Sequence, residues 1–203
     1  VLDGIQLSGA RCLRYQHNDV EHAAQCISRA RESIGRGQIL LVTESVFSMD
    51  GDPAPLDDLN RLAVENGITF LIDEAHALGV FGANGQGRIN HAEHIIRTGT
   101  LSKSFGAYGG IVSGASGLRS VLLSRSRAFI FNTSLPPAVV AGALAALEII
   151  KENPGMGKQL LVKGAELRAC FQAFDFEVLG SASQIVPVVI GDTEQCLALS
   201  KYL

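Results

Sequence analysis

Two short apolar runs separated by one amphipathic helix constrain the fold of this chain more than any other feature. Residues 38–44 (QILLVTE) and 68–73 (ITFLID) each contain a continuous apolar run, as expected for strands covered on both faces. Between them, residues 56–63 place leucine and alanine at helical spacing, and Gly67 follows where a left-handed C-cap is favoured. A strand, a helix and a strand in that order predict a βαβ unit. We therefore expect an α/β fold with a mostly parallel sheet flanked by helices.

The rest of the chain continues the alternation of strands and helices. Further strands are predicted at 95–100, 110–114 and 184–190, and further helices at 118–127, 137–151, 156–174 and 193–203. The segment 152–157 (ENPGMG) interrupts two helices with asparagine, proline and glycine. We expect residues 1–153 to form part of a large domain and residues 154–203 to begin a smaller C-terminal α+β domain. The chain lacks an initiator methionine and ends within a helical pattern, so we expect it to be a piece of a longer protein.

Composition excludes several classes of partner. The 203 residues carry 17 Lys and Arg against 20 Asp and Glu, a formal net charge of −3. This balance predicts no nucleic-acid partner and no anionic membrane partner. No apolar run approaches the roughly 20 residues that a membrane span needs. The four cysteines are far apart and form no CxxC pair, which is typical of reduced thiols in the cytoplasm.

The motif LIDEAH, residues 71–76, places an acidic residue at the end of a predicted buried strand. A buried carboxylate is costly unless it meets a cation or hydrogen-bond donors. Asp73 would fit the protonated nitrogen of a pyridine cofactor, with His76 close enough to reach the same pocket. The same letters also resemble the Walker B box of helicases, in which carboxylates hold Mg²⁺. A third interpretation is an Asp that only caps the next turn, and the motif alone leaves the three open.

The second motif is TGTLSKSFGAYGG, residues 98–110. Lys103 follows a predicted strand and lies among small hydroxyl residues before a glycine-rich turn. A cofactor that forms a Schiff base needs such a lysine for its aldehyde and a nearby turn that binds its phosphate. A surface lysine in a glycine-rich loop is the alternative. The segment is no P-loop, because Ser102 stands where GxxxxGK[ST] requires glycine.

Together the two motifs carry a family resemblance. Residues 43–56 (TESVFSMDGDPAPL), 73–88 (DEAHALGVFGANGQGR), 99–110 (GTLSKSFGAYGG) and 131–138 (FNTSLPPA) resemble the α-oxoamine synthases. These are pyridoxal 5'-phosphate (PLP) enzymes with the fold of aspartate aminotransferase, fold type I. The resemblance runs in register over the whole chain, so it implies that fold and that cofactor.

The resemblance implies a role for each matching residue. Lys103 would attach PLP covalently and later move the α-proton of the substrate. Asp73 would pair with the pyridinium nitrogen, and His76 would contact the phenolic oxygen of the cofactor and lie near the substrate carboxylate. These three are the expected catalytic residues.

Four further residues are expected to bind the cofactor. Ser48 would share the phenolic oxygen with His76. Thr100 and Ser102 would bind the phosphate. Thr133 would reach the phosphate in a neighbouring subunit, because the family builds its active sites across a homodimer interface.

The implied reaction joins an amino acid to an acyl-CoA or acyl-carrier thioester, with loss of CO₂. Residues 135–138 and 183–192 are most similar to the members that use L-alanine and a pimeloyl thioester in biotin biosynthesis. Members that use glycine with acetyl-CoA, or L-serine with palmitoyl-CoA, share the catalytic set. Some residues that the family needs would lie outside this chain, so we expect the piece alone to be inactive.

Two alternative functions, other than that of a PLP enzyme, are also considered for this sequence. A helicase-type NTPase would need an upstream GK[ST] loop and a basic face, and the sequence shows neither. A non-catalytic structural subunit of a synthase pair would be expected to lose the lysine, and Lys103 is present. We expect no metal site, because the histidines of residues 17–22 and 91–94 lack further ligands nearby, and residues 47–52 lack the closing Glu of a calcium loop.

Overall fold

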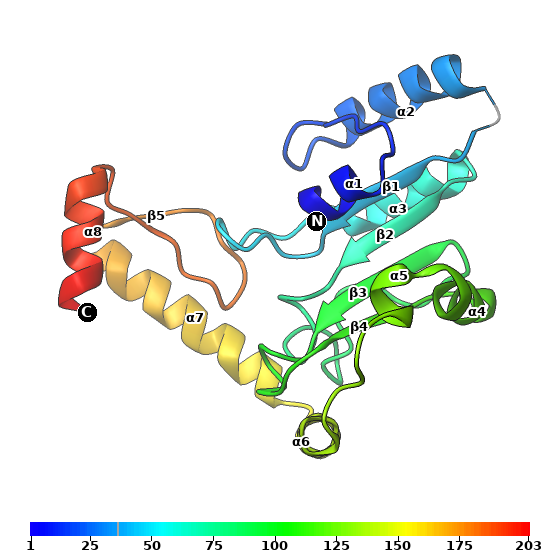
Figure 1. The fold of residues 1–203 in the computed structure, drawn as a ribbon. Helices are drawn as coiled ribbons and strands as arrows, with labels where there is room; N and C mark the ends of the chain where they lie inside the picture. The colour runs from blue at the N-terminus through cyan, green and yellow to red at the C-terminus, as the bar shows by residue number, and fades with distance from the viewer. Residues whose placement is uncertain (36) are drawn as a thin grey trace.

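The computed structural model of the chain describes residues 1–35 and 37–203. Its central feature is a four-stranded sheet in the order β1-β2-β3-β4 (Figure 1). Strands β1 (Leu40–Glu44), β2 (Thr69–Asp73) and β3 (Ile95–Thr100) are parallel, and β4 (Gly110–Ser113) pairs antiparallel with β3. The predicted α/β class with a mostly parallel sheet is confirmed.

The register of the sheet brings polar residues together at one edge. Glu44 pairs with Asp73 at the ends of β1 and β2, and Asp73 pairs with Thr98 of β3. The connection from β3 to β4 is too short for a crossover, so β4 returns antiparallel as a hairpin. All three loops after the parallel strands therefore leave the sheet at the same edge.

The core lies between the sheet and two helices. Helix α3 (Leu56–Glu65) buries Leu56, Leu59 and Ala63 against it, as its helical spacing predicts. Helix α2 (Val20–Ile34) was not predicted, and it buries Ala23 and Ile27 in the same cluster. Its signals are an N-cap, where Asp19 accepts from the backbone N–H of His22, and a glycine directly after its last residue.

The remaining elements follow the sheet, apart from α1 at the start. They are α1 (Leu2–Leu7), α4 (Ser116–Arg125), α5 (Arg127–Ile130), α6 (Pro137–Glu152), α7 (Met156–Ala173), β5 (Glu177–Val178), β6 (Val188–Val189) and α8 (Thr193–Tyr202). Figure 1 shows α7, β5 and α8 on one side of the molecule and the four-stranded sheet on the other, with α6 at the lower end. The break between α6 and α7 falls at the predicted boundary, and the division into two domains stays a prediction.

Two predicted elements differ in the structure. The helix expected at 118–127 is interrupted, because Ser126 adopts an extended backbone (φ −76°, ψ 99°) between α4 and α5. The strand expected at 184–190 was wrong for most of its length, since only Val188–Val189 pairs as β6. Side chains of residues 181–185 bond to backbone and to other loops instead, and Pro187 has no N–H to donate. Within the described residues, no helix is both long and apolar enough to cross a membrane.

Candidate active site

Three loops at the carboxyl edge of the sheet carry most of the expected site residues. The loop after β1 carries Ser48, the loop after β2 carries His76, and the β3–β4 hairpin carries Lys103. Ligands of open α/β sheets bind at this edge. The parallel register therefore explains why residues far apart in the sequence converge.

The closest contact of the site joins Lys103 to His76. Lys103 Nζ lies 2.6 Å from His76 Nε2, which brings two of the three expected catalytic side chains together. Burial, and then the positive charge of Lys103, lower the pKa of His76 below its ordinary value, while Asp73 opposes the shift. The imidazole is therefore neutral near pH 7. A neutral ring can accept a hydrogen bond from the lysine amine.

Asp73 ends β2 and is half-buried. Its Oδ1 accepts a hydrogen bond of 2.9 Å from the backbone N–H of Ala75, which fixes the carboxylate at the start of the loop. Among the described residues this is its one side-chain hydrogen bond, so its second oxygen keeps its accepting capacity. Glu44 lies beside it in register, where burial and then the charge of Asp73 raise the pKa of Glu44.

Thr100 and Ser102 place two hydroxyl groups side by side at the start of the hairpin. Thr100 Oγ1 lies 2.7 Å from Ser102 Oγ, and the backbone N–H of Ser102 donates to Thr100 Oγ1 at 3.2 Å. Thr100 Oγ1 also contacts the carbonyl of Gly109, at 3.2 Å. This pair of hydroxyls suits an anionic oxygen ligand.

A buried carboxylate holds the loop that carries His76. Glu74 is fully buried and accepts from the backbone N–H of Arg88 at 3.1 Å and of Ile89 at 3.2 Å. Its Oε1 also lies 3.7 Å from Nη2 of Arg97 on β3. These contacts close the segment 74–89 into a loop anchored at both ends, so His76 lies on a fixed support.

Two of the expected residues stand apart from these contacts. Ser48 is exposed, and its backbone N–H bonds to Glu44 at the end of β1. Thr133 is exposed in the segment between α5 and α6, and its side chain makes no hydrogen bond to any residue that the structure describes. Its role toward a second subunit stays a prediction.

One residue that touches the site was not predicted. Gln184 Nε2 donates to the backbone carbonyl of His76 at 2.8 Å, although the two are 108 residues apart. The sequence carried no signal for this contact, because the apolar run after Gln184 favoured a strand.

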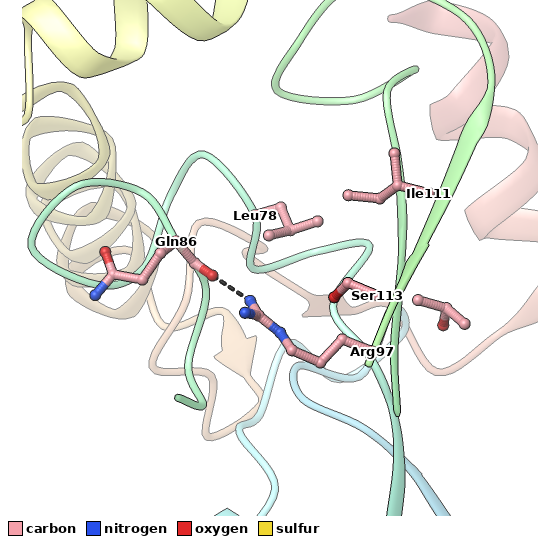
Figure 2. Close-up of a pocket in the computed structure, with 6 residues that line it drawn as sticks. Leu78, Gln86, Arg97, Ile111 and Ser113 are labelled. Atoms are coloured by element: carbon pink, nitrogen blue, oxygen red, sulfur yellow. Dashed lines mark hydrogen bonds between the residues drawn. The ribbon is translucent and has the colours of Figure 1, made fainter. Parts of the chain in front are cut away.

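A small hollow lies between the loop after β2 and the strands β3 and β4. Figure 2 shows Leu78 and Gln86 of the loop after β2 on one side of it, and Arg97 of β3 beside Ile111 and Ser113 of β4 on the other. Arg97 Nη2 donates to the carbonyl of Gln86 here. None of the expected site residues lines this hollow.

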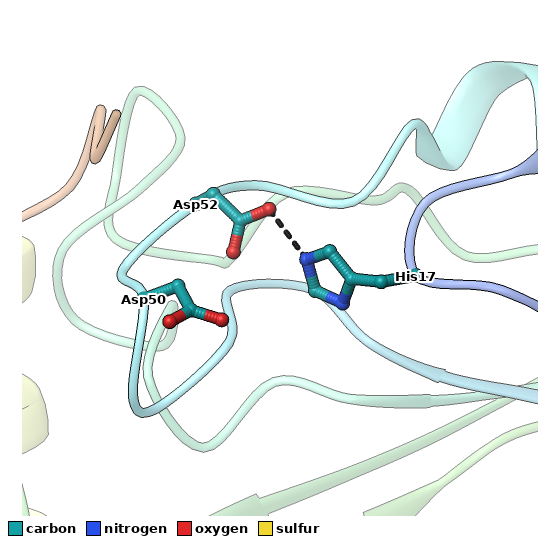
Figure 3. A group of neighbouring side chains, drawn as sticks. All are labelled: His17, Asp50 and Asp52. Carbon is teal, nitrogen blue, oxygen red and sulfur yellow. Dashed lines mark hydrogen bonds and ion pairs between the residues drawn. The ribbon is translucent and has the colours of Figure 1, made fainter. Parts of the chain in front are cut away.

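A second polar cluster joins the start of the chain to the loop after β1 (Figure 3). Candidate ligand atoms of His17, Asp50 and Asp52 lie within 4.8 Å of one another. His17 Nε2 and Asn18 Nδ2 each lie 2.7 Å from Asp52 Oδ2. These contacts hold two loops together, and we assign no metal to them.

Comparison with known proteins identifies the family of this chain. The profile of the aminotransferase class I and II family matches residues 1–203. The chain belongs to this family. The expected fold and family resemblance are thereby confirmed.

Individual relatives of this aminotransferase-family chain have related names. An 8-amino-7-oxononanoate synthase of Acidithiobacillus ferrooxidans is 41% identical over 208 residues, which cover all of this chain and 52% of that protein. A serine palmitoyltransferase of Sphingomonas wittichii superposes with a TM-score of 0.88 at 32% identity, covering 98% of this chain and 50% of that one. A structure described as SPT with PLP gives 0.87 at 33% identity, over 96% of this chain and 50% of that one. The chain thus spans about half the length of the relatives that it matches.

Proposed function

We propose that the protein containing this chain is a PLP-dependent acyltransferase that condenses L-alanine with a pimeloyl thioester, an 8-amino-7-oxononanoate synthase. The observation that carries the proposal is the 2.6 Å contact between Lys103 and His76 beside Asp73 at the carboxyl edge of the sheet. The amino acid and the acyl chain are proposed from the name of the relative at 41% identity.

The residues present fit PLP. Lys103 is exposed, and its amine can reach a cofactor aldehyde. Asp73 keeps an accepting oxygen for a pyridinium N–H, and the Thr100 and Ser102 hydroxyls, 2.7 Å apart, can share a phosphate. Donors, acceptors and the amine thus match the three polar regions of the cofactor.

PLP, when bound, supplies an electron sink for the pair released from the Cα–H bond of an amino acid. Asp73 would hold the ring nitrogen in its protonated form through a charge-assisted hydrogen bond. Lys103 would take the α-proton as general base and return a proton later, because its amine lies at the carboxyl edge of the sheet, where the substrate would bind. His76 would orient that amine and stabilise a developing negative oxygen.

In the proposed reaction, the α-carbon of L-alanine attacks the thioester carbonyl. The C–S bond breaks, and the thiol of coenzyme A or of a carrier leaves. The carboxylate of the alanine then leaves as CO₂, and a proton replaces it on the same carbon. The product is an α-amino ketone.

A second candidate, an L-serine-dependent synthase, is favoured by one specific observation. Serine palmitoyltransferase structures superpose on this chain with TM-scores up to 0.88. The catalytic residues of both candidates would be the same, so the amine substrate distinguishes them. For either candidate we propose a cytoplasmic homodimer.

The test uses the full-length protein. It is loaded with PLP, reduced with borohydride and digested, and mass spectrometry locates the pyridoxyl group. We expect the label on Lys103, its loss in Lys103→Ala, and its retention in the control Lys158→Ala, since Lys158 is exposed on α7. We also expect L-alanine, and neither glycine nor L-serine, to change the cofactor spectrum and to release coenzyme A from pimeloyl-CoA.

Two results would change the proposal. A folded protein without label on Lys103 overturns the enzyme and favours the structural subunit. A spectral change with L-serine instead of L-alanine retains the enzyme class and selects the second candidate.

A further inference from the structure

The segment 181–185, late in the chain, lies against the loops that carry the expected site. Gln184 Nε2 donates to the carbonyl oxygen of His76 at 2.8 Å. A carbonyl oxygen only accepts hydrogen bonds, so the amide must present its nitrogen here. The side chain of His76 contacts Lys103 at 2.6 Å, so one residue is held from two directions.

The same segment also contacts the loop after β1. Ser181 Oγ lies 3.1 Å from the carbonyl of Gly51, in the loop that carries Ser48. A Cβ at Gly51 would lie 2.6 Å from Ser181 Oγ, and the backbone there has a φ of +66°. Only glycine suits this close approach. The segment is therefore packed against two of the three loops at the site.

Contacts with α7 fix the segment from its other side. Arg168 Nη1 donates to the carbonyl of Ser183 at 2.6 Å, and Ser183 is fully buried. A Cβ at Gly164 of α7 would lie 3.0 Å from that carbonyl oxygen, so the helix approaches closely. The segment 181–185 is thus held between α7 and the loops of the site.

We propose that Gln184 is a positioning residue for the Lys103–His76 pair, acting from the C-terminal part of the chain through the main chain of His76. This inference rests on the proposed function, since it concerns the same amine. A shift of the His76 main chain would move the ring relative to Lys103 Nζ, and proton transfer depends on such distances.

The other atom of the Gln184 amide supports a positional role. Gln184 Oε1 is buried and has no hydrogen-bond partner among the described residues. A buried acceptor without a partner lowers stability, so the amide is not explained by stability alone. Replacing Gln184 by methionine, which has similar length, removes both the donor and the unpartnered acceptor. The fold should therefore tolerate this change better than the site does.

The experiment uses the full-length protein with PLP, as wild type, Gln184→Met and the control Gln172→Met, whose side chain is exposed at the end of α7. Deuterium exchange at the ring carbon of His76, followed by mass spectrometry across pH, gives the pKa of this histidine. In Gln184→Met we expect that pKa to rise toward its ordinary value as the ring leaves its half-buried place. We expect kcat to fall about 3- to 10-fold, with KM changed by less.

The control should leave the pKa of His76 and kcat as in wild type. If Gln184→Met does not fold, Gln184→Asn replaces it, because its amide is one methylene too short to reach the carbonyl. An unchanged pKa of His76 with unchanged kcat in either folded variant overturns the inference. Failure of the proposed function would give a different result. The wild type would carry no pyridoxyl group on Lys103, and the comparison of the His76 pKa between the variants would still test the role of Gln184.

Discussion

In the proposed site, the two oxygens of the Asp73 carboxylate have separate partners. Its Oδ1 accepts from the N–H of Ala75, and the other oxygen would receive the pyridinium N–H. In Asp73→Asn the amide oxygen can keep the first bond, whereas the amide nitrogen is a donor and cannot accept the second. We expect normal folding with kcat/KM lowered about 10²- to 10³-fold, measured as coenzyme A release by the full-length enzyme.

The matched control for this change is Asp58→Asn. Asp58 is exposed and pairs with Arg61 on the surface of α3, where an ion pair contributes little. Activity of Asp73→Asn close to that of Asp58→Asn would contradict the role of Asp73.

The lowered pKa of His76 predicts how the free energy of unfolding depends on pH. Because its pKa is lowered in the folded protein, the unfolded chain binds this proton first as the pH falls below about 6.5. The free energy of unfolding should therefore decrease from there down to the folded-state pKa. His76→Asn removes this term, so we expect a smaller loss of stability between about pH 7 and pH 5.5, measured as urea midpoints of the full-length protein.

The comparison variant is His91→Asn, because His91 is exposed. It should retain the pH dependence of the wild type. A His76→Asn profile that coincides with the wild-type profile would exclude this origin of the acid-side loss.

At the scale of elements, local patterns predicted most of the sheet. Continuous apolar runs gave β1 and β2 nearly to the residue, the alternation of strands and helices gave β3, and helical spacing gave α3 and α6. The two motifs then lay at strand ends, which brought Lys103 and His76 to one edge. Contacts between distant segments left no such pattern in the sequence. The hydrogen bond from Gln184 to the carbonyl of His76 forms where the sequence predicted a strand.

The loop from Glu74 to Ile89 depends on one buried carboxylate. Glu74→Gln keeps the shape but leaves an NH₂ group facing backbone N–H donors or Arg97. We expect the free energy of unfolding to fall by about 2–4 kcal/mol, measured by urea denaturation of the full-length protein. Gly87→Ala should act in the same direction, because its Cβ would lie 2.6 Å from Glu74 Oε2 and its φ is +96°.

Glu93→Gln provides the control, since Glu93 is exposed in the segment before β3. Its urea midpoint should match the wild type. If Glu74→Gln were as stable as this control, the carboxylate would not be what closes the loop.

At the scale of the whole molecule, apolar side chains remain exposed around Thr133. Phe129 is 61% exposed, Phe131 73% and Leu135 36%. Large apolar side chains that are exposed close together in the sequence are candidates for contact with a further part of the protein or with a second copy. For the proposed homodimer, we expect the segment between α5 and α6 to lie against the second copy, with Thr133 in the site of that copy.

Subunit mixing tests this arrangement. Thr133→Ala should weaken PLP binding about 10- to 100-fold, the effect of losing one hydrogen bond to a charged group. Lys103→Ala subunits cannot bind PLP covalently. In a mixed dimer of the two variants, the Thr133→Ala subunit keeps its own Lys103 and receives Thr133 from its partner, so that site is intact.

Exchange of equal amounts should place about half of the dimers in this mixed form, each with one intact site. We expect the mixture to recover about a quarter of the wild-type tight PLP binding, measured as pyridoxyl label on Lys103 at limiting PLP. If Thr133 served the site of its own subunit, every subunit that carries Lys103 would lack it, and mixing would recover nothing above the average of the two parents. The label at limiting PLP therefore distinguishes a shared site from one completed within a single subunit.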